Sequence, residues 1–496
     1  MARQMLKNLA MLDDREVIGA RHHSLDLWPV LLFVVHLAQG LAFSRLYPEH
    51  LFDPDILSYF VYFRNWLEST TALHGAAFFN QPKPLLVFGL GPLGDATLAF
   101  YCTAVASAAL GTLVYLIGRR AFGQATAILW SLLLLLDPQK GFLTLKSSAD
   151  LYLTVFLFAA IFFLLAGRRG AASVALLFSA LVKPVTIPCA AVLLAGNGSR
   201  RRRWVYAAIP LLALPLTMLA NVVLLGSALD PGQYLREFAM LRDGDSIQPA
   251  ELVHFALWTQ LVKTRFVSTA PLGIVGLFIW VARDRRRLES PLLVIPLLFL
   301  GGYLTLTAVT VYMPFFRFFW PLEVWFLGFL TYGIVEIAQR LAVGHRWGQA
   351  AVASVLLFFV VDDSVVKHLS YRDHFALPME ANMAFVNSSR AVLATQRAAG
   401  EHVLVPLAFQ PYLMWELDAR GPAEIATAEQ AALHGSGTFP EWILHVPRGY
   451  VSQRAQDLVT QLIHDGGYEV RLTDGQASLL ALPSAGRVEP APSDAG

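Results

Sequence analysis

The sequence predicts an all-α polytopic membrane bundle of about 11 membrane helices, two of them short, followed by a small C-terminal α/β domain outside the membrane. Three observations predict this. The chain has 496 residues, of which 56% are hydrophobic and only 15% charged, which is too apolar for an ordinary soluble domain. Runs that are free or nearly free of charge recur as far as residue 361. From Asp362 onward the composition becomes that of a soluble domain.

A helix that crosses a membrane needs about 20 apolar residues, and shorter helices are possible inside a bundle. Segment 1–26 is mixed in charge and no small-residue cleavage site follows it, so it predicts a cytoplasmic N-terminal segment ahead of a retained first helix. The runs that predict membrane helices are 27–44, 96–118, 121–136, 151–166, 172–182, 185–196, 204–229, 266–282, 291–316, 318–339 and 347–361.

The short pair, 172–182 and 185–196, decides the predicted orientation. As a single helix it would carry Lys183 at mid-membrane and place the four arginines at 200–203 opposite the other basic loops. As two half-depth helices that turn at Lys183-Pro184, it returns these arginines to the cytoplasmic side, where Lys and Arg concentrate. The transmembrane domain is therefore expected over 27–361, with outer loops at 45–95 and 227–265. The composition is compatible with a bacterial inner (plasma) membrane, with the N-terminus cytoplasmic.

The C-terminal segment 362–484 predicts an extracytoplasmic (periplasmic) α/β domain, and 485–496 predicts a disordered tail. Apolar residues at helical spacing from Ala455 to Ile463 predict a helix that ends at Gly466-Gly467. Alternation in 468–473 predicts a half-buried strand. Two further strands are expected in 402–408 and 441–447.

Several functional classes are excluded. A net charge of +2, without a basic and aromatic block outside the apolar runs, predicts no nucleic-acid partner. The sequence has no P-loop and no Gly-x-Gly-x-x-Gly fingerprint. Cys102 and Cys189 fall inside apolar runs, where packing is their expected role. The histidines show no metal-ligand spacing, so no cofactor is predicted, and a divalent metal is left open without supporting residues.

Asp53 and Asp55 lie in the first outer loop, and Tyr59 follows Asp55 by four residues, one helical turn, so that carboxylate and phenol could face the same way. Such a carboxylate can serve as a general base. The alternative is a solvated pair that caps an interfacial helix, because acidic residues are favoured at helix N-termini.

Lys83 stands between two prolines at the other end of this loop. Because proline stiffens its neighbours, Lys83 is expected on a rigid corner, where an ammonium suits a phosphate. The alternative is a lysine that extends to the lipid headgroups.

Arg317 lies among aromatic residues in 311–325, at the expected outer end of a membrane helix. An ionisable residue within an apolar run indicates function, and Arg can bind a lipid phosphate through two donors. The alternative is an interfacial arginine paired with Glu323 or with headgroups.

Further charges are predicted on the same outer side. Asp137, Lys146 and Asp150 lie in the short loop 137–150, and Lys183 lies at the turn of the hairpin. Each alone is typical of a loop charge. Their common side makes them candidates for a site.

This pattern resembles the C superfamily of membrane glycosyltransferases (GT-C), especially the protein O-mannosyltransferases and the lipid A aminoarabinose transferases, over residues 25–345. Asp55 and Tyr59 match the acidic motif of the family's first outer loop, and "KPLL" at 83–86 matches its Lys-Pro-Pro-Leu with one proline fewer. Asp150 resembles an acid that opens a span, Lys183 a Thr-Lys turn, and "RFFWP" at 317–321 an Arg-Tyr-x-x-Pro helix start. The chain departs from the pattern at Ile56, where the family has Glu, and at Phe318, where it has Tyr.

The resemblance implies an inverting glycosyltransferase that moves a sugar from a polyprenyl-phosphate donor to a glycan, lipid or protein acceptor at the outer face of the membrane. It implies that Lys83 and Arg317, together with Lys183, bind the phosphate, and that Asp55 is the base. Asp53 would orient or replace Asp55, and loop 45–95 would be the catalytic loop. Two other functions stay open: a transporter or flippase of lipid-linked sugars, and a catalytically inactive membrane assembly protein.

Overall fold

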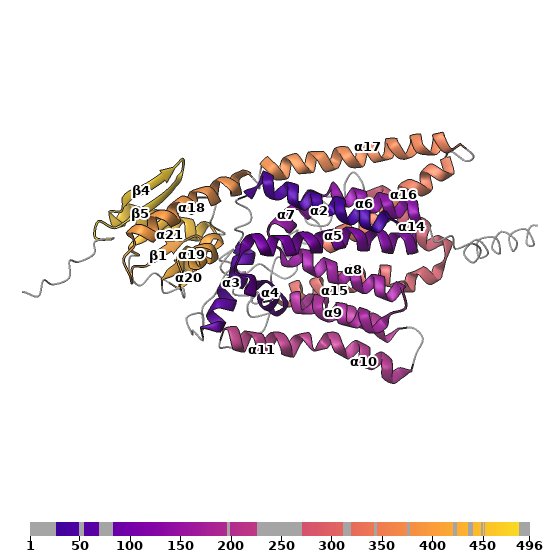
Figure 1. Ribbon diagram of the computed structural model, residues 1–496, viewed down its shortest axis with the longest axis horizontal. Helices are drawn as coiled ribbons and strands as arrows, with labels where there is room; N and C mark the ends of the chain where they lie inside the picture. Colours follow the sequence, from indigo (N-terminus) through magenta and orange to yellow (C-terminus); the bar gives the residue numbers. More distant parts are fainter. Residues whose placement is uncertain are drawn as a thin grey trace, which may run out of the picture.

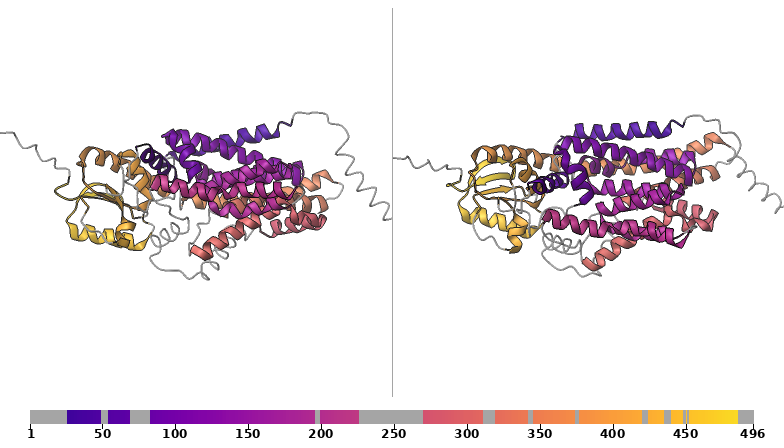
Figure 2. Two further views of the ribbon diagram at one scale, coloured as in Figure 1. Left: turned by 90° about the horizontal axis from the view of Figure 1, so that it is seen from below. Right: turned by 60° about the horizontal axis from the view of Figure 1, so that its bottom comes forward.

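The computed structural model describes residues 26–48, 54–68, 83–195, 199–225, 270–310, 319–341, 345–373, 377–419, 424–434, 440–447, 450 and 452–485. Two parts lie end to end: a bundle of roughly parallel helices and a small α/β domain at one of its ends (Figures 1 and 2). The buried apolar side chains of the two parts form one continuous cluster. The site described below lies where they meet.

The bundle is built from apolar helices that run along its long axis (Figure 1). Its members are α2 (Trp28–Leu46), α5 (Ala96–Ala121), α6 (Gln124–Leu135), α7 (Pro138–Leu145), α8 (Ala149–Leu165), α9 (Arg169–Val182), η3 (Pro184–Leu194), α10 (Arg200–Leu211), α11 (Ala213–Leu225), α14 (Ala270–Arg283), α15 (Pro291–Thr310), α16 (Trp320–Leu341) and α17 (Arg346–Tyr371). Three short elements, α3 (Pro54–Leu67), α4 (Pro84–Leu90) and η2 (Gly91–Leu93), lie at the end nearest the α/β domain.

Each predicted membrane run coincides with one or more of these helices. Among the described residues, five segments are long and apolar enough to cross a membrane: α2, α5, the stretch Arg200–Leu225, α16 and α17. The pair α6 and α7, bent by 60°, gives a sixth, and the other apolar helices are 10–17 residues long. The number of crossings therefore stays a prediction. Helix α17 continues past Asp362, where the soluble domain was predicted to begin, as far as Tyr371.

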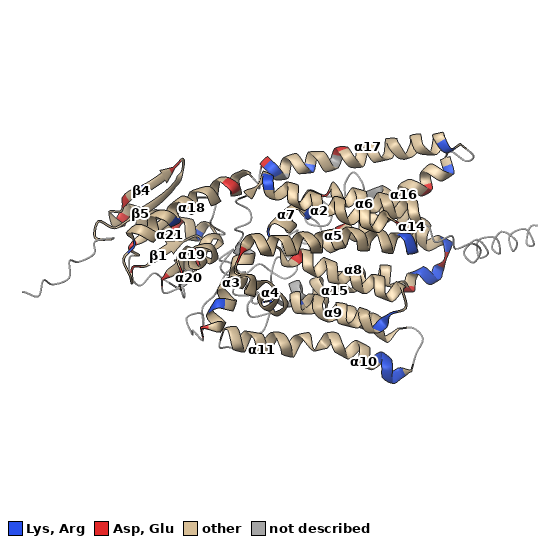
Figure 3. Ribbon diagram, in the orientation of Figure 1, with Lys and Arg blue, Asp and Glu red and all other residues tan. Residues whose placement is uncertain are grey.

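The chain breaks at Lys183, as the sequence predicts, because Pro184 cannot continue the hydrogen bonding of α9. The second half, η3, is a 3-10 helix that contains Pro188, and it packs against α9, α10 and α15. Lys and Arg gather at the end of the bundle away from the α/β domain, where α9 and α10 begin and α14 ends (Figure 3). The C-terminal end of α9 and the start of η3 therefore lie toward the α/β domain.

The C-terminal domain has a five-stranded sheet in the order β2-β1-β3-β5-β4. Strands β2 (Ile425–Thr427), β1 (Val403–Val405) and β3 (Trp442–His445) are parallel, and β5 (Ala477–Ala481) and β4 (Glu469–Asp474) are antiparallel to their neighbours. Helices α18 (Leu377–Gln396) and α19 (Gln410–Glu416) cover one face. Helices α20 (Ala428–His434) and α21 (Gln453–Gly466) cover the other.

All three predicted strands and the helix that ends at Gly467 are present, and Gly467 has the left-handed backbone (φ 65°) that ends helices. One detail was wrong: β4 is not half-buried, and Val470 is 60% exposed. The reason is that β4 is an edge strand that pairs only with β5, with an irregular register between Val470 and Leu472.

Candidate functional site

Four of the seven predicted site residues have described side chains: Tyr59, Lys83, Asp150 and Lys183. Asp55 lies in α3, one turn before Tyr59, but its side chain is outside the described part. Asp53 and Arg317 lie outside the described residues, as does loop 227–265.

Tyr59 and Lys83 come together although 24 positions separate them in the chain. Tyr59 is fully buried on α3, which begins at Pro54, and proline is favoured at the first position of a helix. Lys83 precedes Pro84 and therefore has an extended backbone (φ −108°, ψ 100°) at the start of α4. The Lys83 ammonium lies 5.6 Å from the centre of the Tyr59 ring, a cation–π contact. Pro84 thus accounts for the extended backbone that places Lys83 just before α4.

Asp150 and Lys183 form a buried ion pair. Their side chains are 2% and 15% exposed, and the Lys183 Nζ donates to Asp150 Oδ1. Asp150 lies in the first turn of α8, where the positive end of the helix dipole favours an anion. Its backbone N–H donates to Ser148 Oγ (3.3 Å), which caps this helix. Lys183 has an extended backbone (φ −146°, ψ 115°) before Pro184. Both residues were predicted as candidates, but their pairing was not.

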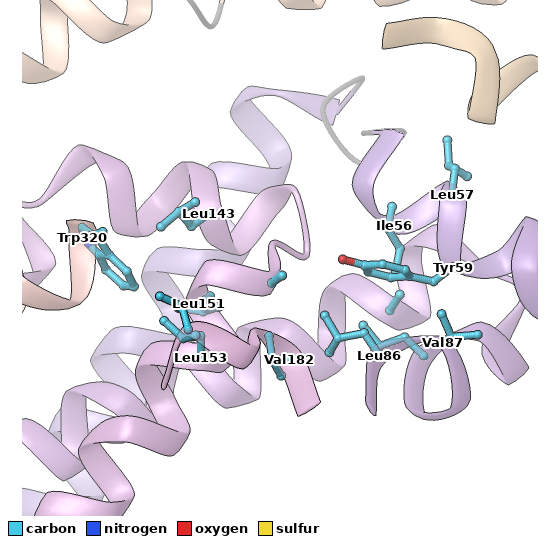
Figure 4. Close-up of a cluster of buried hydrophobic side chains, with 14 of the residues drawn as sticks. Ile56, Leu57, Tyr59, Leu86, Val87, Leu143, Leu151, Leu153, Val182 and Trp320 are labelled. Carbon is cyan, nitrogen blue, oxygen red and sulfur yellow. The ribbon is translucent and has the colours of Figure 1, made fainter. Parts of the chain in front are cut away.

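The two pairs lie at the same end of the bundle. Helix α4 packs against both α3 and α9, so Lys83 at its start and Lys183 after α9 belong to neighbouring elements. Figure 4 shows the Tyr59 ring extending from α3 toward Val182 and Leu151, the chain neighbours of Lys183 and Asp150. The Lys83 and Lys183 ammonium groups and the Asp150 carboxylate together carry a net charge of +1, and ammonium groups suit a phosphate.

The predicted short loop 137–150 is mostly a helix, α7, whose eight residues are all buried. Asp137 caps it by accepting from the Gln139 N–H (3.0 Å), and the second oxygen accepts from Trp320 Nε1 (2.5 Å) at the start of α16. Lys146 follows its last residue. The dipeptide Asp137-Pro138 is a sequence signal for this helix start, since Asp caps and proline follows.

Lys140 is a buried cation that the sequence did not single out. It is 1% exposed on α7, and its Nζ donates to Gln39 Oε1 (2.5 Å) on α2. No sequence pattern distinguishes it from a loop lysine, because its burial depends on contacts with α2, 101 positions away. Within the described ranges, no three His, Cys, Asp or Glu side chains gather as they would around a metal ion.

Comparison with solved structures shows that the chain shares its fold with a protein of known structure. The chain is similar to ArnT from Cupriavidus metallidurans bound to undecaprenyl phosphate, with a TM-score of 0.53 and 14% identity over 94% of this chain and 100% of that one. The apo form of the same protein gives 0.52 and 15% over 92% and 97%. No family model matches the sequence, and no curated protein matches it significantly.

The shared fold, together with the apolar helices, makes this chain an integral membrane protein and confirms the resemblance predicted from sequence at the level of fold.

Proposed function

We propose that this protein transfers a sugar from a polyprenyl-phosphate donor to an acceptor hydroxyl at the membrane face that bears the C-terminal domain. One observation carries the proposal: Lys83 and Lys183 lie on neighbouring elements at the bundle end where α3, the helix of Asp55 and Tyr59, also lies. A donor with a lipid chain explains why these cations lie at the end of a membrane bundle. The fold of a protein that binds undecaprenyl phosphate supports the same ligand class.

In this mechanism Lys83 and Lys183 bind the donor phosphate, with Arg317 as a third cation. The acceptor oxygen attacks the anomeric carbon while the bond from that carbon to the phosphate oxygen breaks. The acceptor proton passes to the Asp55 carboxylate, and polyprenyl phosphate leaves with the electron pair of the broken bond. Because the leaving group carries growing negative charge, the fixed ammonium groups stabilise the transition state. A single displacement inverts the anomeric centre.

Asp150 has a distinct role in this proposal. Its buried carboxylate holds the Lys183 ammonium in one place. Without this ion pair, the flexible lysine side chain between α9 and η3 would adopt several positions. Asp53 orients Asp55 or substitutes for it. If the acceptor is itself a phosphate, no base is needed, and Asp55 positions groups instead.

The test is sugar transfer by the purified protein in lipid nanodiscs from a radiolabelled polyprenyl-phosphate sugar pool. We expect Asp55→Asn to lower the rate by about 10²–10⁴-fold, the usual contribution of a general base. The matched control is Asp95→Asn, because Asp95 caps α5 through the Leu98 N–H and asparagine caps equally well. Lys83→Ala is expected to lower the rate too, and Lys367→Ala on α17 is its control.

The outcome separates the open functions. Transfer that is lost in Asp55→Asn and retained in Asp95→Asn supports the transferase with Asp55 as base. Transfer that is unchanged in both Asp55→Asn and Lys83→Ala contradicts the assignment of base and phosphate ligand. Movement of the labelled lipid across the bilayer, with no transfer to any acceptor, would establish the flippase instead.

A further inference from the structure

Arg64, near the end of α3, is bound to the C-terminal domain by both terminal nitrogens of its guanidinium group. Its Nη1 donates to Asp418 Oδ1 (2.8 Å), and its Nη2 donates to the carbonyl oxygens of Met414 (3.3 Å) and Ala419 (2.7 Å). The guanidinium carbon also lies 5.3 Å from the centre of the Trp415 ring. The Arg64 side chain is only 13% exposed. These contacts join residues about 350 positions apart.

The partners of Arg64 form the C-terminal end of helix α19. Met414 lies in the last turn of α19, and its carbonyl oxygen accepts from the Ala419 N–H as well as from Arg64. Carbonyl oxygens at the C-terminal end of a helix carry partial negative charge, which suits a guanidinium. Asp418 is 79% exposed, and an exposed ion pair contributes little. The two carbonyl bonds and the contact with Trp415 are therefore the specific part of this connection.

Between Tyr59 and Arg64, helix α3 also packs against Trp415 and against η2. The Phe60 ring packs on Trp415, with 5.3 Å between ring centres. Element η2 approaches α3 so closely that a Cβ on Gly91 would lie 2.6 Å from Phe63 Cβ and 3.0 Å from the Tyr59 carbonyl oxygen. Trp415 and η2 thus leave α3 little freedom to move, and Arg64 binds its far end.

We propose that Arg64 and Trp415 are positioning residues: they bind α3 to the C-terminal domain and thereby fix Tyr59 and Asp55 relative to Lys83. This inference rests on the proposed function and adds a role for the C-terminal domain. Arg64 lies more than one turn beyond Tyr59 and is engaged by α19, so it acts through the helix and does not touch the reacting atoms. The domain is then a part of the machinery that sets the rate of the reaction.

The experiment compares kcat and KM for the labelled donor in the parent, Arg64→Ala, Trp415→Ala and Arg64→Lys. We expect kcat of Arg64→Ala to fall about 10- to 100-fold, because small misplacements of reacting groups have effects of this size. KM for the donor should stay within about twofold, because the phosphate ligands are unchanged. Arg64→Lys keeps the charge without the planar fork and should recover part of kcat.

The matched control is Arg390→Ala. Arg390, on α18, also forms an ion pair with α19, through Glu416 Oε2 (3.0 Å), so this variant weakens contacts within the C-terminal domain. We expect its kcat to remain within about twofold of the parent. If Arg390→Ala lowers kcat as much as Arg64→Ala does, general loosening of the domain explains the effect and the positioning role is refuted.

A second readout does not depend on activity. Spin labels are placed at Leu67, at the end of α3, and at Leu98 on α5, which are 63% and 50% exposed, after the exposed Cys102 is replaced by serine. We expect Arg64→Ala, or Arg64→Lys if the alanine variant does not fold, to broaden the distance distribution between the labels. An unchanged distribution refutes the inference even if the parent transfers no sugar. Unchanged kcat in an active protein refutes it while the proposed function stands.

Discussion

Adjacent glycines of α15 provide a sharp test of the packing that holds Lys183. A Cβ on Gly302 would lie 2.5 Å from the Val185 carbonyl oxygen in η3, whereas a Cβ on Gly301 meets no atom within 4 Å. Ordinary carbon–oxygen contacts begin at about 3.3 Å, so Gly302→Ala must separate α15 from η3 by roughly 0.8 Å. The contacted atom is the backbone oxygen of Val185, so no side-chain rotation can relieve the contact. Val185 is two residues from Lys183, so a shift of η3 is expected to reach Lys183.

The expected change in the free energy of unfolding has opposite signs in Gly302→Ala and Gly301→Ala. Overpacking of this kind costs about 1–3 kcal/mol, and the better helix propensity of alanine, about 0.5–1 kcal/mol, offsets only part of it at Gly302. At Gly301 only the gain remains. We therefore expect Gly302→Ala to lower the free energy of unfolding and Gly301→Ala to raise it slightly.

The assay is unfolding of the purified protein in mixed micelles titrated with SDS, followed by circular dichroism. Sugar transfer is measured in parallel, and we expect it to fall in Gly302→Ala alone. A Gly302→Ala variant as stable as Gly301→Ala would refute the close approach of α15 and η3, and with it the packing argument for Lys183.

Three further predictions follow from described contacts. Lys183→Met leaves the buried Asp150 carboxylate without its ion partner and should destabilise the protein by about 3–5 kcal/mol, whereas adding Asp150→Leu should restore much of the loss in the same SDS titration. In Asp137→Asn the amide oxygen can still cap α7, but the amide NH₂ takes the place of the carboxylate oxygen that accepts from the Trp320 indole N–H. The loss of this hydrogen bond should lower the free energy of unfolding by about 1.5–3 kcal/mol and shift the tryptophan fluorescence. Burial lowers the pKa of His445 below its usual 6.5, so the unfolded chain binds a proton that the folded domain does not. Thermal stability should therefore fall as pH drops below 6.5, and His445→Gln should reduce this dependence.

Hydropathy predicts most of the bundle because spans in lipid must be both apolar and helical. It failed at 137–150, where α7 is short and contains Lys140. Its residues are buried by other helices, and its polar residues Lys140 and Thr144 are hydrogen-bonded to protein partners. The segment can therefore be buried without an apolar sequence. It also did not distinguish the 3-10 geometry of η3 from α-helix, although Pro184 and Pro188 remove the donors that an α-helix would use.

For the candidate site, the sequence indicated individual residues but not the contacts between them. The charge pattern indicated that Asp150 and Lys183 share a side, because the hairpin fixes which end of each segment carries the basic residues. It gave no sign that they pair, since that depends on how α8 packs against α9. Arg64 gave no signal at all, because its role exists only through α19, which follows about 350 positions later.

The two lysines of the site are fixed by the same local device. Lys83 and Lys183 each precede a proline, each has an extended backbone, and each begins a helical segment whose first residue is that proline. The steric effect of proline keeps the lysine out of the helix, and the helix that follows keeps the chain from moving away. What differs is the partner, a neutral ring for Lys83 and a buried carboxylate for Lys183. A substitution of Lys183 therefore removes the ion partner of a buried carboxylate, whereas a substitution of Lys83 removes a cation from a neutral ring.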